Sequence, residues 1–228
     1  MKKNLILLAM LAAGMTAFAA DGDAPKTDFA WKSGETVDWT AHFRVGVNVP
    51  TGTPDGYKFA PFRSWDLEIT FLQMDWNPGK GRQTYSIGLG YGWHNYTLKD
   101  NGTMFQKVGS VTGLGQFAST MSDTYSRLHV GSISMPVLFT QKIGKKQGLS
   151  IGGEVNFNVS GHLSNGYEQG DDYTRIQTSS IGLRPVTVDI MGIYDFGGLA
   201  IYAKYSPMNK FKKDRGPEFK SLSFGLYF

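Results

Sequence analysis

The stretch that decides the fold is the last one of the chain, Phe219-Lys220-Ser221-Leu222-Ser223-Phe224-Gly225-Leu226-Tyr227-Phe228. Apolar residues alternate along it with small or polar residues, and successive side chains of a β-strand point to opposite faces of a sheet. One face suits lipid, and the other, with two serines and a glycine, suits a tight polar interior. An open apolar edge strand invites aggregation, whereas a closed barrel pairs its last strand with its first. The pattern therefore predicts a transmembrane β-barrel.

The same alternation recurs in seven earlier segments, so that eight strands are expected. It is clearest at 85–94, where large apolar residues alternate with serine, glycine and histidine. The alternation slips near Leu72, which indicates a β-bulge, and Pro136 requires a bulge or an unpaired amide position. The remaining segments lie at 41–49, 65–71, 125–142, 151–160, 186–195 and 199–205.

The connections between these segments alternate in length without exception. Short turns follow the second, fourth and sixth segments, and longer loops rich in Gly, Ser, Thr or Lys follow the others, at 50–64, 99–123, 165–178 and 207–217. Outer-membrane barrels have short periplasmic turns and longer extracellular loops. We therefore expect an eight-stranded antiparallel up-and-down barrel with both termini in the periplasm. A soluble lipocalin-like barrel would share the alternation but not the loop asymmetry.

The start of the chain has the features of a secretory signal peptide. Two lysines precede an apolar run at 5–13, and Ala17-Phe18-Ala19 has the form of a cleavage site. We expect cleavage near Ala19 or Ala20 and a mature protein in the bacterial outer membrane; a retained N-terminal anchor is the alternative. The expected organisation is a signal peptide at 1–20, a periplasmic extension at 21–37 and an outer-membrane β-barrel domain at 38–228.

Composition excludes several other classes of protein. The chain has no cysteine, so neither a disulfide framework nor a lipid-accepting cysteine is expected. Removing Lys2 and Lys3 with the signal lowers the formal charge from +4 to +2, which gives no indication of nucleic-acid binding. His42 and His129 lie on separate segments without the close spacing of a metal site, so we expect no metal and no cofactor.

Part of the second half resembles a known family. Ile133-Ser134-Met135-Pro136-Val137-Leu138-Phe139-Thr140 leads through the basic turn Gly144-Lys145-Lys146 into the glycine-rich segment 149–155, and the resemblance continues at 195–206 and in the last strand. These features resemble the PorT-like outer-membrane β-barrel family. The resemblance implies the barrel fold and the outer membrane and carries over no catalytic residues. Some members of that family resemble components of secretion machinery.

Seven charged or histidine side chains are expected inside the barrel, because each falls on the polar face of its strand. An eight-stranded barrel is just wide enough for its own side chains to fill it, and an unpaired buried charge costs several kcal/mol. We therefore expect a salt-bridged polar plug and a barrel that conducts no solute; a narrow transporter or channel is the alternative. The seven residues are Arg44, Asp66, Glu68, His94, Glu154, Asp189 and Lys204.

One short motif points to chemistry. Gly161-His162-Leu163-Ser164-Asn165-Gly166 resembles the His-x-Ser-Asn element of outer-membrane lipid A deacylases. In that family the histidine is the general base, the serine is the nucleophile and an acidic residue orients the histidine, a role that Glu168, Asp171 or Asp172 would fill here. Counting from Glu154 places His162 and Ser164 inside the barrel, the opposite side from the one that a lipid-cleaving enzyme needs.

The sequence therefore predicts a non-enzymatic outer-membrane barrel. It would act structurally, as an adhesive or binding surface through its long extracellular loops, or as a component of an envelope assembly, and a lipid A deacylase-like hydrolase is the alternative. Its expected partners are outer-membrane lipid and lipopolysaccharide, together with the barrel-insertion machinery, which would read Phe228 as its signal. We expect a monomer. The loop with Lys210, Lys212, Lys213 and Arg215 is expected to be solvated.

Overall fold

The computed structural model describes residues 36–99, 102–144 and 146–228. Within these ranges the chain is all-β, with two single turns of 3-10 helix, η1 (Pro61–Arg63) and η2 (Pro78–Lys80). The predicted signal peptide at 1–20 and most of the predicted extension at 21–37 lie outside the described residues. Thr36 and Val37 belong to the first strand, so the sheet begins slightly before the predicted boundary at 38.

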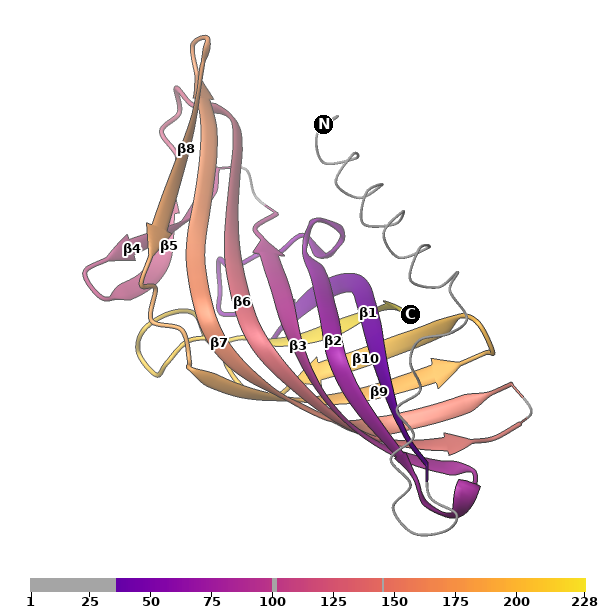
Figure 1. Ribbon diagram of the computed structural model, residues 1–228. Coiled ribbons are helices and arrows are strands. Elements are labelled where there is room, and N and C mark those ends of the chain that lie inside the picture. Colours follow the sequence, from indigo (N-terminus) through magenta and orange to yellow (C-terminus); the bar gives the residue numbers. More distant parts are fainter. Residues whose placement is uncertain (1–35, 100–101, 145) are drawn as a thin grey trace.

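An antiparallel sheet closes on itself through the hydrogen bonds of eight strands. The ring runs β1–β2–β3–β6–β7–β9–β10–β11 and back to β1, as the sequence predicts (Figure 1). Its strands are β1 (Thr36–Thr51), β2 (Trp65–Asn77), β3 (Gln83–Thr97), β6 (Ser122–Lys142), β7 (Gly148–Gln169), β9 (Val186–Asp195), β10 (Ala200–Ser206) and β11 (Lys220–Tyr227).

Pairing of β1 with β11 closes the ring, so the segment that decides the fold meets the first strand. Val47 lies opposite Phe224, and Phe228 exchanges two backbone hydrogen bonds with Phe43, at 2.8 and 2.9 Å. The rings of Phe43 and Phe228 stack at 6.4 Å, and about half of Phe228 is exposed. Each strand of the ring is therefore paired on both sides.

Three further strands lie in segments that the sequence pattern assigns to loops. β4 (Thr103–Val108) and β5 (Val111–Gln116) form a hairpin, and β8 (Asp172–Ser179) pairs with the far end of β7. The prediction of loops at 99–123 and 165–178 is wrong in this respect. β8 has almost no apolar alternation to reveal it, because each of its residues is exposed or only partly buried.

The connections divide by length as predicted. Short turns join β2 to β3, β6 to β7 and β9 to β10 at one end of the ring, and the segments with η1, the β4–β5 hairpin and β8 lie at the other. Figure 1 shows β6, β7 and β8 rising beyond the other strands at this loop end.

Three irregularities of the sheet bear on the sequence predictions or on the candidate sites, besides the register shifts near Thr40 and Ser122. The register of β2 against β3 shifts between Thr70 and Leu72, which confirms the predicted bulge. Opposite Pro136 the β3–β6 pairs are interrupted, and a Cβ on Gly88 would lie 2.9 Å from the proline ring, so glycine is needed there. The third was not predicted: β6 and β7 shift register so that Gly131 faces Ser160 while Ser132 faces Asn158, which leaves Val159 as an extra residue.

The two faces of the ring differ sharply in polarity. The buried side chains at its middle are mostly polar or charged, whereas large apolar side chains are exposed on the outer face of every strand of the ring. In the described ranges, no helix has the length and apolar character needed to cross a membrane.

Candidate functional site

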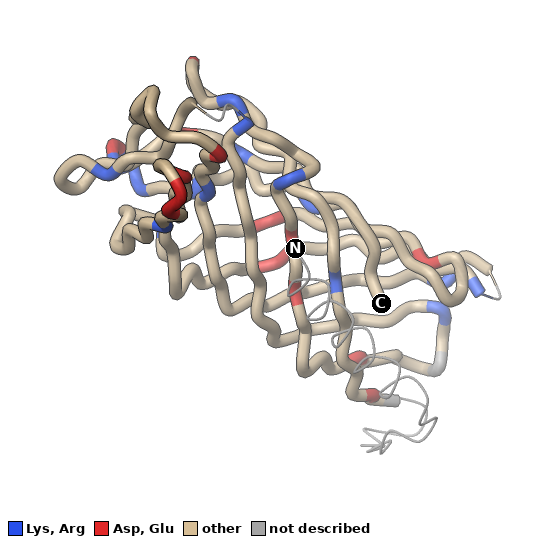
Figure 2. Tube along the Cα trace, turned by 90° about the horizontal axis from the view of Figure 1, so that it is seen from above, with Lys and Arg blue, Asp and Glu red and all other residues tan. Residues whose placement is uncertain are grey.

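The ring interior holds a compact network of ion pairs that includes all seven predicted residues. Arg44 on β1 pairs with Glu68 on β2 and, across the ring, with Glu154 on β7 at 2.8 Å. All seven side chains are buried. In Figure 2 the strands are tan over most of their length, with a few charged positions in the middle. The alternation of the strands thus brings charges from distant parts of the chain together.

Lys204 is the second cation of this network. Its Nζ lies 3.3 Å from Asp66, 3.4 Å from Glu154 and 3.8 Å from Asp189. Asp66 also accepts a hydrogen bond from the hydroxyl of Tyr202 at 2.8 Å. Its Oδ1 lies 2.5 Å from His94 Nδ1. Four carboxylates from three strands, β2, β7 and β9, are thus held by cations and donors from the other strands.

A loop lysine is buried above the network, without an ion pair to it among the described residues. Lys210, expected in a solvated loop, is buried and donates to Ser206 Oγ at 3.1 Å, so that expectation is wrong for this residue. Burial opposes its charge, but Tyr96 and the carboxylate of Asp189 outweigh burial and raise the pKa of Lys210. The loop has no periodic pattern from which the direction of its side chains could be predicted. Charge balance offers the reason for its position, because the network has four carboxylates but only two strand cations.

Apolar side chains close the loop end of the ring above this network. Phe105 of the β4–β5 hairpin is fully buried between the rings of Tyr57 and Phe59, and its backbone N–H donates to Ser126 at 2.8 Å. Asn165 on β7 donates to the Phe105 carbonyl, also at 2.8 Å. The same cluster contains Tyr96, Leu98, Leu128, Val130, Leu163, Ile181, Phe211 and Phe219.

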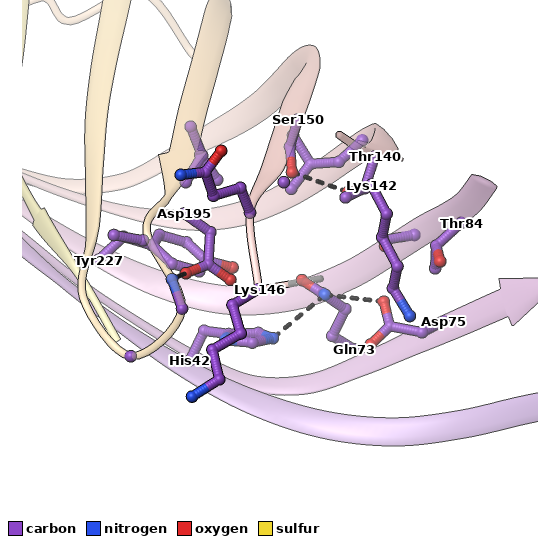
Figure 3. A pocket seen from close by; sticks show the side chains of 18 of the residues that line it. His42, Gln73, Asp75, Thr84, Thr140, Lys142, Lys146, Ser150, Asp195 and Tyr227 are labelled. Carbon is purple, nitrogen blue, oxygen red and sulfur yellow. Dashed lines mark hydrogen bonds between the residues drawn. The ribbon is translucent and has the colours of Figure 1, made fainter. Parts of the chain in front are cut away.

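The turn end of the ring is open and holds a cavity of about 590 Å³ (Figure 3). On one wall, Gln73 donates to Asp75 at 2.9 Å and contacts His42 Nε2 at 3.2 Å. Lys142 at the end of β6 and Lys146 in the following turn also line the cavity. The cavity, which we call the vestibule, is also lined by Leu138, Ile193 and Tyr227. These apolar residues pack in one cluster, and the vestibule lies below the charged network.

The predicted catalytic candidates lie on the outer face of the ring, not inside it. Because Val159 is an extra residue, the alternation of β7 reverses there, and His162 and Ser164 face outward beside His129 and Arg127. The expectation that they point inward is therefore wrong. Their neighbour Leu163 is the inward residue and belongs to the apolar cluster.

These outward residues do not form a catalytic triad. Ser164 Oγ accepts a hydrogen bond from Arg175 Nε at 3.0 Å, while the His162 ring stacks on His129 at 4.8 Å. Glu168 lies opposite Tyr173, and Asp171 and Asp172 lie in and beside the turn that begins β8. Among the described residues, no hydrogen bond or ion pair joins His162 to Ser164 or to any of these three carboxylates.

No protein-family model matches the chain, and no curated protein matches it either. The resemblance to PorT-like barrels therefore remains a prediction. In the part of the chain that the structure describes, no group of three or more His, Asp or Glu side chains is placed to hold a metal ion. The geometry thus offers three places for function: the plugged interior, the vestibule, and the outward surface around His162.

Proposed function

We propose that this protein is an outer-membrane β-barrel that conducts no solute and serves as a binding or structural component of a Gram-negative cell envelope. The observation that carries the proposal is the inverted polarity of the ring, with charges paired inside and large apolar side chains exposed outside. Soluble monomers rarely expose a continuous apolar surface of this kind, whereas a lipid-facing barrel requires one.

Aromatic side chains support a membrane position. Toward the turn end, Trp76, Tyr85 and Phe139 form a row on three neighbouring strands, with ring centroids 5.4 and 5.3 Å apart. Toward the loop end, Tyr91 and Trp93 lie 4.5 Å apart on β3, near exposed Trp65. Two aromatic girdles at the edges of an apolar belt are typical of barrels whose ends meet the lipid headgroups.

The filled interior argues against the transporter or channel alternative. The paired charges occupy the middle of the ring, and the apolar cluster around Phe105 closes the loop end. A solute entering the vestibule would meet side chains that are buried and bonded to one another. An eight-stranded ring leaves little other space for a pathway.

The hydrolase alternative gains one observation and loses another. Ser164 lies on the outward side of β7, which a lipid-cleaving enzyme needs, although its side chain is fully buried there. However, its hydroxyl is bonded to Arg175, and in the described residues no carboxylate contacts His162 to orient it. Lipid A from cells that produce the intact protein or Ser164→Ala tests this alternative: the proposal expects identical acylation, and a serine-dependent loss of acyl chains would establish the enzyme instead.

The proposed function is tested by location and conductance together. We expect the protein to fractionate with the outer membrane, to migrate faster on a gel when unheated, and to give no stable conductance in planar bilayers. Recovery in a soluble fraction would refute the membrane proposal, whereas stable channels would refute the plug and leave the barrel standing.

A further inference from the structure

A group of six side chains on the outer face of β6, β7 and β8 is distinct from both the interior network and the vestibule. We name it the rim cluster: Tyr125, Arg127, His129, His162, Tyr173 and Arg175. In the ladder Arg127 lies opposite Ser164, His129 opposite His162, and Tyr125 and Arg175 both opposite Gly166. Opposite residues of neighbouring strands share a face, so the six side chains project together.

The cations of this cluster have no acidic partner in the described part of the chain. Burial and the positive charges of Arg63 on η1 and Arg175 all disfavour the positive charge of Arg127, and a tyrosine hydroxyl supplies no negative charge near neutral pH. Glu168, the next outward residue of β7, forms no ion pair with Arg127 or Arg175. The two guanidinium groups of the rim cluster therefore have no acidic counter-charge in the described part of the chain.

A buried donor of this cluster is also unused. Arg127 Nε is inaccessible to solvent yet has no hydrogen-bond partner among the described residues. The guanidinium group of Arg127 lies 4.6 Å above the Tyr125 ring, which fixes its plane. Arg175 Nε, by contrast, is bonded to Ser164 at 3.0 Å. Neither Nε is therefore open to an outside ligand, and the terminal Nη groups of the two arginines, which form no hydrogen bond among the described residues, are the donors left for an oxyanion.

Glycine makes this arrangement possible. A Cβ on Gly166 would overlap the Tyr125 ring and lie 2.8 Å from the Tyr173 hydroxyl. Because Gly166 has no Cβ, the two tyrosines approach each other across β7 and flank the arginines. The site is thus built by packing and is not a chance group of surface cations.

The height of the cluster identifies the environment that it meets. The last exposed apolar residues below it on these strands are Ile133, Phe157 and Val159. His129 precedes Ile133 by four residues, which is about 13 Å along a strand and less along the normal of a tilted barrel. The cluster therefore lies just outside the apolar belt, where lipid headgroups would surround the barrel.

We propose that the rim cluster binds the phosphate group of a membrane lipid headgroup, with Arg127 and Arg175 as its two principal ligands. Guanidinium groups bind phosphate through paired, charge-assisted hydrogen bonds, and the tyrosine hydroxyls and imidazoles add further donors. The apolar belt directly below would receive the acyl chains. This inference rests on the proposed function, because it requires the ring to lie in a membrane.

The test uses the full-length mature protein in detergent micelles, with native mass spectrometry to count bound lipid. The probes are bisphosphorylated lipid A, the same lipid after enzymatic dephosphorylation, and inorganic phosphate. We expect retention of the phosphorylated lipid and a loss of about tenfold or more in apparent affinity for Arg127→Gln/Arg175→Gln. The matched control is Lys212→Gln/Lys213→Gln, which removes two exposed cations elsewhere at the loop end and should change affinity less than about twofold.

The variant Arg127→Lys/Arg175→Lys keeps the charge and loses the guanidinium geometry. Its affinity should fall between that of the parent protein and that of Arg127→Gln/Arg175→Gln. Equal retention of phosphorylated and dephosphorylated lipid, or equal loss in the control, would overturn the inference. If inorganic phosphate at the same concentration displaces the lipid, the claim that the bound phosphate belongs to a lipid headgroup is overturned. All variants must show the heat-modifiable gel shift; if the parent protein lacks it, the membrane proposal itself has failed, whereas a shift without phosphate-dependent binding refutes only this inference.

Discussion

At the scale of single residues, Lys204 shows why the interior is a plug. Three carboxylates lie within 3.8 Å of its Nζ, and the side chain is almost fully buried. Taking two charges out of water is favourable only when pairing and hydrogen bonds compensate, and removal of one partner leaves the others uncompensated. The loss of one charge therefore destabilises the protein by more than the strength of an average ion pair would suggest.

We expect Lys204→Met to lower the free energy of unfolding by about 3–5 kcal/mol, because Asp66, Glu154 and Asp189 would keep their charges without this cation. Urea titration of the refolded protein in micelles measures the change. The control is Lys220→Met on β11, where the side chain is exposed and the expected change is within about 0.5 kcal/mol. Equal stability of the two variants would contradict the role of Lys204.

At the scale of elements, the extra residue in β7 decides which side chains reach the outer surface. Strand parity alone correctly directs Arg44, Asp66 and the rest of the network inward, because their strands are regular between them. It fails for His162, since a single unpaired residue at Val159 reverses the alternation and nothing in the local sequence marks it. The hairpin and β8 were missed because these short strands bury few or no residues, so that apolar and polar residues do not alternate along them.

The reversal in β7 is tested by cysteine labelling, for which the absence of native cysteine gives a clean background. We expect His162→Cys to react with a water-soluble maleimide in the folded protein and Leu163→Cys to react only after unfolding, because Leu163 is 1% exposed. Mass spectrometry of the labelled protein gives the extent of reaction. The reverse order of reactivity would restore the regular alternation and place His162 inside.

The β4–β5 hairpin is expected to stabilise the loop end through Phe105. Replacing this ring with alanine leaves a cavity between Tyr57 and Phe59, and we expect a loss of about 3–5 kcal/mol in unfolding free energy. Val108→Ala is the matched control in the same hairpin, since that side chain is 69% exposed. If both variants unfold at the same urea concentration as the parent, the hairpin does not form part of the core.

At the scale of the whole molecule, the order of the strands, the closing pair β1–β11 and the division of connections by length all follow from alternation and turn residues along the chain. The contents of the loop end do not, because Lys210, Phe105 and the rim cluster depend on how separate loops and strands meet. The sequence therefore predicts the scaffold, while the candidate sites appear only once the ring is assembled.

The central claim is that the outer face of the ring lies in lipid. Its most direct test is spin labelling at Ile151, Ile190 and Phe224, three exposed apolar positions on different strands, with the protein in lipid vesicles. We predict that molecular oxygen reaches these labels more readily than a water-soluble nickel complex does, and that a label at Lys213 in the exposed loop shows the opposite order. Equal or greater access of the nickel complex at the three strand positions would contradict the account.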